Sequence, residues 1–152
     1  MNTRDCDVLI IGGGLAGLQA AVTLAEKAPE KKMLIADLGG GASSEIMGFC
    51  APLAPDDSPE IFMEDTLRVG AGENDPALVK RLCYDAAGMV KYLEKLGVEF
   101  DRRDDGSYDL LRPVGSSFPR VVHHKTTTGK VVMEKYRELL RKSLCVEFHK
   151  TR

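Results

Sequence analysis

The feature that most constrains the fold is a run of glycines between two apolar segments. Asp7–Ile11 predicts a buried parallel strand, and the Ala- and Leu-rich stretch Leu15–Ala28 predicts a helix that stops before Pro29. Between them lies Gly12-Gly13-Gly14-Leu15-Ala16-Gly17, which has the spacing GxGxxG. A second apolar run, Lys32–Asp37, completes a strand–helix–strand unit and ends on an acid. This context predicts a Rossmann-like α/β fold rather than an isolated glycine-rich turn.

The same residues predict a dinucleotide site. Gly12 permits a tight turn, Gly14 lets a pyrophosphate approach the backbone, and Gly17 lets helix and strand pack closely. The helix N-terminus adds free N–H groups and roughly half a positive charge. Asp37 would accept hydrogen bonds from an adenosine ribose and repel a 2′-phosphate, which argues against NADP, while FAD and NAD both remain open. The predicted contacts here are Gly12, Gly14, Leu15, Ala16, Gly17 and Asp37.

Two helices are predicted after the loop-like stretch Leu38–Pro59. Each begins with a capping residue followed by proline and ends near a glycine. They run from Ser58 to Gly70 and from Asp75 to Gly97. On the second helix, one face predicts a core-facing stripe. Its members are Val79, Leu82, Cys83, Ala86, Val90 and Leu93.

The remainder predicts shorter elements and a second strand–helix connection. The predicted elements are strands at Val98–Phe100 and, weakly, Tyr108–Val122, a helix at Gly129–Ser143 and a strand at Leu144–His149. The Lys, Arg and Glu residues of 134–142 indicate a solvated helix face. We therefore expect one incomplete domain in three parts. These are 1–58 with the first strands and loop, 59–122 as a mostly helical insertion, and 123–152 as the returning helix and strand.

The balance of charged residues and the cysteine spacing limit which partners and sites are expected. The 152 residues include 21 basic and 23 acidic side chains, so neither nucleic acid nor an anionic membrane is expected as a partner. Val8–Ala25 is apolar enough to suggest a signal-peptide core, but Asp5 and Asp7 precede it and its glycines are explained by the nucleotide site. We expect no targeting segment and no membrane span. The four cysteines match no metal spacing, which favours reduced thiols in a cytoplasmic protein.

Four stretches resemble the flavoprotein subunits of succinate dehydrogenase and fumarate reductase and the related L-aspartate oxidases. The first is the glycine-rich start already described, which many flavoprotein families share. The second, which is much more specific, reads Glu64-Asp-Thr-Leu-Arg-Val-Gly-Ala-Gly-Glu-Asn-Asp-Pro76. The third is Leu96-Gly-Val-Glu-Phe-Asp101 followed by Asp105-Gly106. The fourth is Pro119-Arg-Val-Val-His123 leading to Thr128-Gly129.

The resemblance implies FAD rather than NAD as the cofactor. It also implies that Ser43 and Ser44 match a Ser/Thr pair that lies along the cofactor. Many relatives tether the flavin through a histidine near that pair, but no histidine precedes His123 here, so we expect non-covalent FAD. The further cofactor contacts predicted in this way are Leu38, Ser43, Ser44, Gly48, Phe49 and Cys50.

Three departures from the family pattern fall where flavin and substrate would meet. Met47–Cys50 replaces Ala-Gln-Gly-Gly, Val114–Ser116 replaces Gly-Gly-His, and Thr126 replaces an Asp. These changes argue against assuming the family's dicarboxylate substrate, but they do not affect the expectation of FAD. Arg120 and His123 are candidates to line the flavin or substrate cavity, and the alternative is a solvated loop. An inert Cys50 is favoured over a flavin-facing one.

We expect a flavin-dependent oxidoreductase that moves a hydride between a substrate carbon and flavin N5. Its expected partners are a small-molecule substrate, the remainder of the flavoprotein or a second chain, and an electron-transfer partner; no metal site is expected. About three parallel strands are predicted where such sheets usually have five or six, so this chain is expected to be only part of the enzyme. The alternatives are an NAD-binding enzyme resembling thiazole synthases and a non-catalytic nucleotide-binding subunit.

Overall fold

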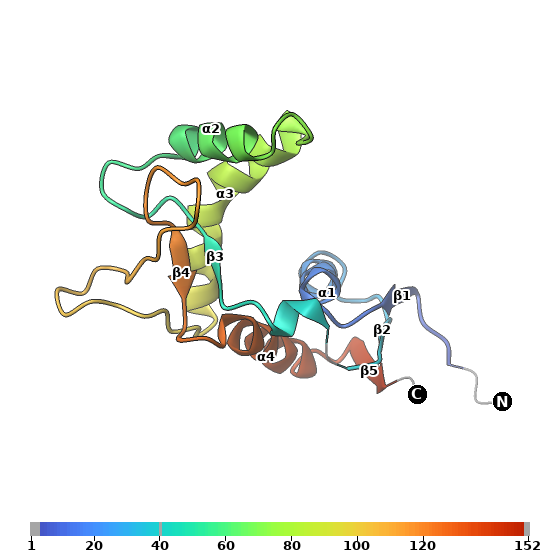
Figure 1. Cartoon of the computed structure of the whole chain (residues 1–152). Helices are drawn as coiled ribbons and strands as arrows, with labels where there is room; N and C mark the ends of the chain where they lie inside the picture. Colours follow the sequence, from blue (N-terminus) through green and yellow to red (C-terminus); the bar gives the residue numbers. More distant parts are fainter. Residues whose placement is uncertain (1–3, 40, 151–152) are drawn as a thin grey trace. The chain divides into compact units, whose positions relative to one another are not determined.

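A computed structural model describes residues 4–39 and 41–150, which form two compact units (Figure 1). One unit contains the described residues up to Ile46 and those from Gly129 onward, and the other is Met47–Thr128. The predicted helical insertion, 59–122, lies inside the second unit. No helix among the described residues is long and apolar enough to cross a membrane.

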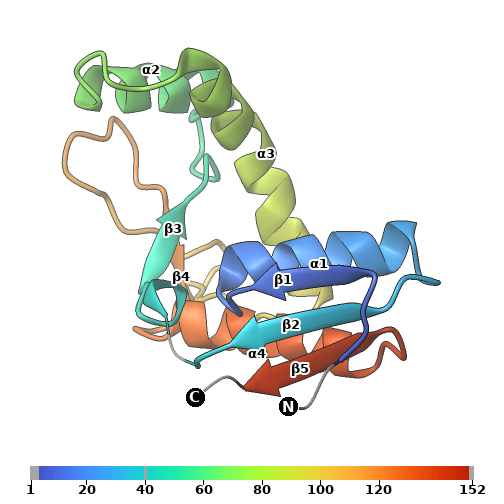
Figure 2. The same ribbon diagram turned by 90° about the vertical axis from the view of Figure 1, so that its right-hand side faces the viewer.

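The first unit is built on a parallel sheet of three strands. They are β1 (Val8–Ile11), β2 (Met33–Asp37) and β5 (Val146–Lys150), in the order β1-β2-β5. Helix α1 (Leu15–Lys27) connects the first two strands and α4 (Thr128–Arg141) precedes the third (Figure 2). The α/β fold and the three parallel strands predicted from the sequence are confirmed.

One face of this sheet is packed against helices, and the other face is not. Ile10 and Ile35 align across β1 and β2, and Ile35 is fully buried beneath the helices. A Cβ on Gly17 of α1 would lie 3.2 Å from Ile10 Cγ2, which places α1 on this face. The alternate residues of β1 point the other way, and Leu9 and Ile11 are 52% and 84% exposed. Because side chains alternate along a strand, the sheet has one packed face and one open apolar face.

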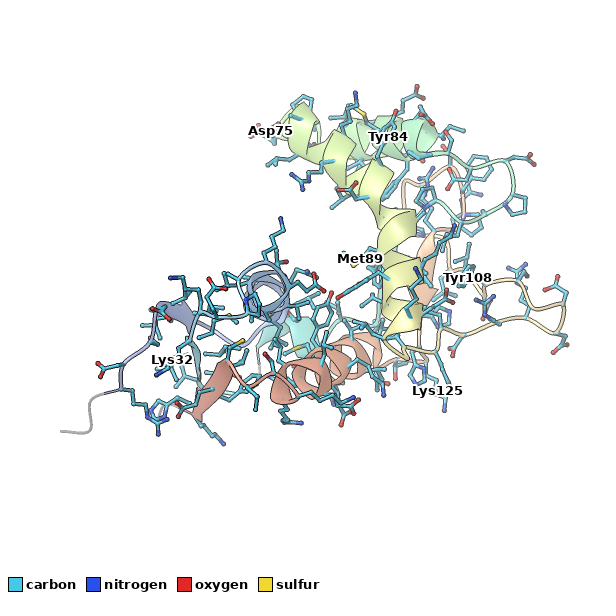
Figure 3. All side chains as sticks on the ribbon, turned by 180° about the vertical axis from the view of Figure 1, so that it is seen from behind. Lys32, Asp75, Tyr84, Met89, Tyr108 and Lys125 are labelled. Carbon is cyan, nitrogen blue, oxygen red and sulfur yellow. The ribbon has the colours of Figure 1, made fainter. Side chains whose placement is uncertain are left out.

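The second unit combines two helices with a two-stranded antiparallel sheet. Helices α2 (Pro59–Val69) and α3 (Pro76–Lys95) pack together, and β3 (Gly48–Cys50) pairs with β4 (Val121–His123). Both predicted helix starts are confirmed. Ser58 Oγ accepts a hydrogen bond from Ile61 N–H at 3.3 Å, and Asp75 Oδ1 accepts from Ala77 and Leu78 N–H at 2.8 and 3.2 Å. Figure 3 shows Asp75 at the start of α3.

Several local predictions are wrong. Val98–Phe100 is not a strand; Val98 and Phe100 are buried beside the end of α3, which the short apolar pattern could not distinguish from sheet burial. Tyr108–Val122 contributes only isolated bridges before β4 begins. Leu82 of the predicted core stripe is 57% exposed, although the stripe's other five members are buried. The loop after β2 contains a short 3₁₀ turn, Ala42–Ser44, and β3.

Candidate cofactor site

The glycine turn has the geometry that its sequence predicts. Gly12 has φ +105°, and its N–H donates to Ala36 O at 2.8 Å, which joins the turn to β2. A Cβ on Gly17 would lie 2.0 Å from Gly12 O, so only glycine allows this approach of helix to turn. A Cβ on Gly14 would meet only Ser43 Oγ, at 3.6 Å. The backbone at Gly14 therefore stays accessible where a pyrophosphate would approach.

Ser43 lies against the start of α1. Its Oγ accepts a hydrogen bond from Leu15 N–H at 3.2 Å, which makes it a long-range cap for the helix. A Cβ on Gly129 would lie 2.0 Å from Ser43 O, and Gly129 N–H donates to Ile46 O at 2.9 Å. Ser44 Oγ instead donates to Gly41 O at 2.7 Å. The structure thus brings Ser43, but not the Ser44 hydroxyl, onto the helix N-terminus.

Asp37 ends β2 beside the glycine turn. Its Oδ1 accepts from Gly39 N–H at 3.1 Å, and its Oδ2 accepts from Arg137 Nη2 at 3.2 Å. The same Nη2 donates to Gly13 O at 3.1 Å. A Cβ on Gly13 would lie 2.3 Å from Asp37 Oδ2, so a side chain at this position would displace the Asp37 carboxylate. Leu38, by contrast, is 72% exposed.

Arg137 is the residue of this unit that sequence reasoning missed. Its helix face was predicted to be solvated, yet Arg137 is only partly exposed and reaches both Asp37 and Gly13. It lies on a face with Lys130 and Arg141, beside a pocket of about 240 Å³ that also includes Ser44. The only sequence signal was an arginine seven residues after Lys130 on the same helix side.

These residues fit a flavin adenine dinucleotide. The turn leaves backbone open at Gly14, the α1 N-terminus carries positive partial charge, and Asp37 keeps lone pairs beyond the two already used. A carboxylate can accept about four hydrogen bonds, so two remain for ribose hydroxyls. The arrangement is therefore suited to a nucleotide with a diphosphate and an unmodified ribose.

The predicted flavin-side residues Gly48, Phe49 and Cys50 form β3 in the second unit. Gly48 pairs with His123, and a Cβ on Gly48 would lie 2.7 Å from Val122 O. The Phe49 and Phe100 rings form an edge-to-face pair with centroids 5.9 Å apart. Burial raises the pKa of the half-buried Cys50 thiol, against a smaller opposing effect of Arg120. A neutral thiol fits the expectation that Cys50 is not a reactive nucleophile.

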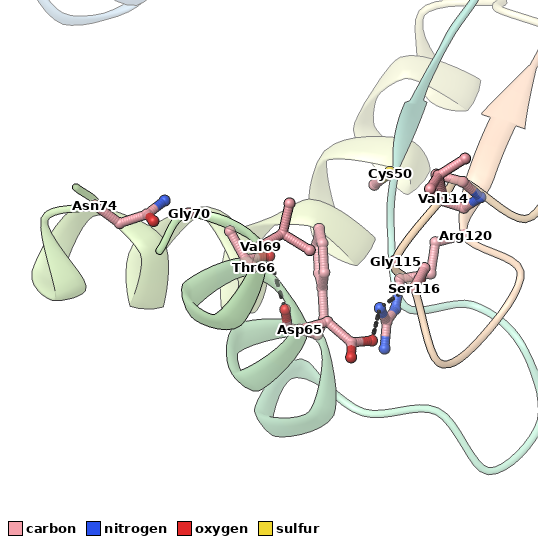
Figure 4. A pocket seen from close by; sticks show the side chains of 12 residues that line it. Cys50, Asp65, Thr66, Val69, Gly70, Asn74, Val114, Gly115, Ser116 and Arg120 are labelled. Carbon is pink, nitrogen blue, oxygen red and sulfur yellow. Dashed lines mark hydrogen bonds and ion pairs between the residues drawn. The ribbon is translucent and has the colours of Figure 1, made fainter. Parts of the chain in front are cut away.

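Arg120 is fully buried at the centre of a charged cluster, and Figure 4 shows it with Asp65 and Ser116. Its Nε and Nη2 donate to the two carboxylate oxygens of Asp57, each at 2.7 Å, and its Nη1 donates to Asp65 Oδ2 at 2.6 Å. The Phe62 ring lies 4.9 Å from the guanidinium carbon. Arg120 is therefore not in a solvated loop, since two carboxylates from the α2 region hold it.

Asp65 completes this cluster from inside α2. Burial alone would raise its pKa, but hydrogen bonds from the Ser117 backbone, Arg120, the Ser117 hydroxyl and Arg68 outweigh burial and hold the pKa well below its usual value. Asp65 is thus ionised throughout the physiological range. The cluster borders a pocket of about 310 Å³ that includes Cys50 and Asn74. Asp57 and Asp65 were not singled out from the sequence, because neither carries a local signal of pairing with an arginine more than 50 residues away.

His123 is buried in β4 between two carboxylates. Its Nδ1 lies 3.0 Å from Asp101 Oδ2, and its Nε2 lies 3.8 Å from Asp109 Oδ2. Neither ring nitrogen has a well-aligned hydrogen-bond partner among the described residues, so the short distance to Asp101 is a close contact without hydrogen-bond geometry. The neighbouring His124 and Lys125 make local contacts, to Glu99 O and to the Asp101 carboxylate.

With this geometry established, comparison with known proteins decides the family. The sequence matches the family described as "FAD binding domain" over residues 7–151. The chain belongs to this FAD-binding family. The expectation of FAD rather than NAD is confirmed, and so is the resemblance to the fumarate reductase, succinate dehydrogenase and L-aspartate oxidase flavoproteins.

Two relatives of this FAD-binding domain illustrate the match. A fumarate reductase (CoM/CoB) polypeptide of Methanothermobacter marburgensis is 34% identical over 142 residues, covering 88% of this chain and 26% of the relative. The L-aspartate oxidase of Synechocystis sp. is 36% identical over 134 residues, covering 88% and 24%. The chain therefore spans about a quarter of the length of the curated relatives it matches.

Solved structures share the fold of the FAD-binding domain. A chain of the quinol fumarate reductase of E. coli superposes with a TM-score of 0.88 at 24% identity, covering 97% of this chain and 26% of the other. A flavocytochrome c3 fumarate reductase superposes with a TM-score of 0.76 at 26% identity, covering 94% and 26%. The likeness thus extends over both units and over nearly every element of the chain.

Proposed function

We propose that this chain supplies the FAD site of a flavin-dependent oxidoreductase that transfers a hydride between a substrate carbon and flavin N5. The observation that carries the proposal is the accessible glycine turn between β1 and α1, with Asp37 at the end of β2 and Ser43 at the helix start. The bound FAD supplies the hydride chemistry, and the protein supplies binding and orientation.

Each contact in the first unit has a defined role in this proposal. Gly12 and Gly14 shape the turn that the diphosphate approaches, and Gly17 holds α1 close enough to present its N-terminus. Leu15 and Ala16 contribute the first N–H groups of the helix, one of which Ser43 already binds. Asp37 receives the adenosine ribose. Leu38, Ser44 and the β3 residues Gly48, Phe49 and Cys50 stay predicted contacts.

The substrate and the partners are proposed only at the level of chemical class. The relatives' names include a fumarate reductase and an L-aspartate oxidase, but Met47–Cys50, Val114–Ser116 and Thr126 differ from the family pattern. We infer a small organic substrate, a cytoplasmic location, and further polypeptide that contributes the substrate-binding residues. His123 remains a candidate for the cavity, whereas Arg120 is engaged by Asp57 and Asp65.

Flavin content tests the proposal directly. The protein as isolated, with any polypeptide that co-purifies, should show the absorption spectrum of bound flavin. Gly14→Val should remove the flavin, while circular dichroism and the melting temperature stay close to those of the flavin-free parent, because a Cβ at this position would meet only Ser43 Oγ. A folded Gly14→Val protein that keeps its full flavin content would contradict the proposed site.

Non-covalent attachment is tested on the same preparation. The three histidines are His123, His124 and His149, so no histidine lies in the glycine-rich loop that the family uses for tethering. Acid precipitation should leave the yellow colour in the supernatant. Flavin fluorescence that migrates with the denatured polypeptide of this chain would show that the attachment is covalent.

A further inference from the structure

The side chain of Arg137 joins two parts of the dinucleotide site that are far apart in sequence. It projects from α4 and donates through one nitrogen to the Asp37 carboxylate, at 3.2 Å, and to the Gly13 carbonyl, at 3.1 Å. Its side chain is 26% exposed, so these are not the contacts of a freely moving surface arginine. The glycine loop and the acid are thereby fixed by the same charged group.

The bond to Gly13 O has a consequence for the loop. The Gly13 carbonyl and the Gly14 N–H belong to one planar trans peptide and therefore point in opposite directions. A guanidinium that holds the carbonyl toward α4 turns the Gly14 N–H to the other side of the loop. Arg137 therefore sets the orientation of one of the donors available to a diphosphate.

The bond to Asp37 has an electrostatic consequence. A carboxylate beside the glycine turn repels the two negative charges of a diphosphate, and a guanidinium 3.2 Å from that carboxylate offsets the repulsion. The contact also restricts Asp37 to one side-chain orientation, with Oδ1 held by Gly39 N–H at 3.1 Å. An acid that is fixed in this way loses less conformational freedom when it binds a ribose.

We propose that Arg137 is a positioning residue for the adenosine half of FAD, acting through Asp37 and the Gly13 peptide. This inference rests on the proposed function, because it assumes that the glycine turn and Asp37 receive the dinucleotide. It assigns a role to α4, a helix that the GxGxxG motif does not include. It also makes recognition of the adenosine ribose dependent on a residue 100 positions after the acid.

The test is Arg137→Met, with Lys135→Met as the matched control. Lys135 also lies on α4, pairs with Glu138 at 3.3 Å and does not line the pocket beside Arg137, so its replacement removes the same charge from the same helix. FAD is titrated into the flavin-free form of the protein as isolated. Loss of a charged hydrogen-bonding group predicts that Arg137→Met raises the FAD dissociation constant roughly tenfold or more. Lys135→Met should leave the FAD dissociation constant within about twofold of the parent value.

A second readout separates positioning from stability. An FAD analogue that lacks the 2′-hydroxyl of the adenosine ribose should bind the parent more weakly than FAD, and Asp37→Asn should abolish that preference. Arg137→Met should reduce the preference as Asp37→Asn does, whereas a purely structural role would leave it intact. If Arg137→Met is too unstable to titrate, Arg137→Lys replaces it. Lysine keeps the positive charge but lacks the forked N–H groups of the guanidinium. We therefore expect a preference for the 2′-hydroxyl between those of the parent and Arg137→Met.

The outcomes distinguish this inference from the proposed function. If Arg137→Met binds FAD as the parent does, or keeps the full preference for the 2′-hydroxyl, the inference is overturned while the site can still stand. If Gly14→Val also retains FAD, the proposed site itself is wrong. Loss of FAD in Gly14→Val together with loss of ribose preference in Arg137→Met supports both.

Discussion

At the scale of single residues, the glycines of the turn have separable roles. Gly17 is required by packing, because its Cβ would lie 2.0 Å from Gly12 O, a backbone atom that cannot move aside cheaply. Gly14 has no such neighbour, since only Ser43 Oγ lies within reach, at 3.6 Å. Gly17 therefore serves the packing of the fold, and Gly14 leaves room for the ligand, which are the separate roles that the motif predicts.

This distinction predicts opposite results for two alanine substitutions. Gly17→Ala should destabilise the protein by roughly 1–3 kcal/mol or more through overpacking. Gly14→Ala should leave the unfolding free energy nearly unchanged and weaken FAD binding. Chemical denaturation of the flavin-free forms measures the first effect and flavin titration the second. Equal losses of stability in the two variants would show that the distinction is wrong.

In the second unit, Arg120 is a residue whose loss should cost a large amount of folding stability. Its guanidinium is buried and pairs with two carboxylates that are themselves removed from water, Asp57 at 0% and Asp65 at 8% side-chain exposure. Removing one partner of a buried ion pair costs about 3–5 kcal/mol, because it leaves the other charge uncompensated. Its structural importance follows from its burial together with the two carboxylates.

We therefore expect Arg120→Met to lower the unfolding free energy by roughly 3–5 kcal/mol. The control is Arg103→Met, which breaks an exposed pair with Asp109 whose side chains are 57% and 46% exposed. Exposed pairs contribute about 0–1 kcal/mol. Urea denaturation of both variants decides the matter. A loss at Arg120 no larger than that at Arg103 would mean that the cluster is not desolvated as described.

At the scale of elements, α3 is defined by its two ends and one apolar face. Asp75 caps its first N–H groups and Pro76 occupies the first helical position, where no intrahelical donor is needed. Tyr84 Oη donates to Glu60 Oε1 at 2.8 Å and links the helix to α2 (Figure 3). The start of α3 thus depends on one local side chain, whereas its position depends on contacts with α2.

Replacing the cap isolates its contribution. Asp75→Ala should cost about 1 kcal/mol of stability, because two N–H groups lose their acceptor. The neighbouring Glu73→Ala also removes an exposed acid but does not alter the cap, so it should cost little. Thermal unfolding of the two variants under identical conditions provides the comparison. A Glu73→Ala loss that matches Asp75→Ala would attribute the effect to net charge rather than to capping.

At the scale of the whole molecule, the open face of the parallel sheet is the most consequential feature. Leu9 and Ile11 of β1 are 52% and 84% exposed on the face opposite the helices. Parallel sheets are normally covered on both faces, because strand–helix–strand connections place helices there and the strands are apolar on both sides. The described residues cover only one face of this sheet.

An isolated polypeptide of residues 1–152 should accordingly self-associate through that face. Leu9→Lys combined with Ile11→Lys should shift the light-scattering mass toward the monomer. The matched control is Val114→Lys with Leu144→Lys, which adds the same charge at two fully exposed positions outside the strands. If the control suppresses association equally, net charge and not the sheet face is responsible.

The sequence by itself determined what local patterns can encode. The strand–glycine turn–helix start, the acid at the end of β2 and the capped starts of α2 and α3 follow from residue type and spacing within a few turns of chain. Steric freedom of glycine, the fixed φ of proline and the alternation of apolar residues act locally and leave a readable pattern. The choice of FAD came from resemblance, since spacing alone allowed NAD.

Only the tertiary structure decided which distant residues meet. Arg137 reaches Asp37 across 100 positions, and Arg120 reaches Asp57 and Asp65 across 63 and 55. Tertiary packing also decided that β3 pairs with β4 and that Val98 is buried without being part of a strand. An arginine on a helix has the same local pattern whether it faces water or a carboxylate. Its partner is set by how the elements pack, because the energy of a charge pair depends on separation in space and burial, not on separation along the chain.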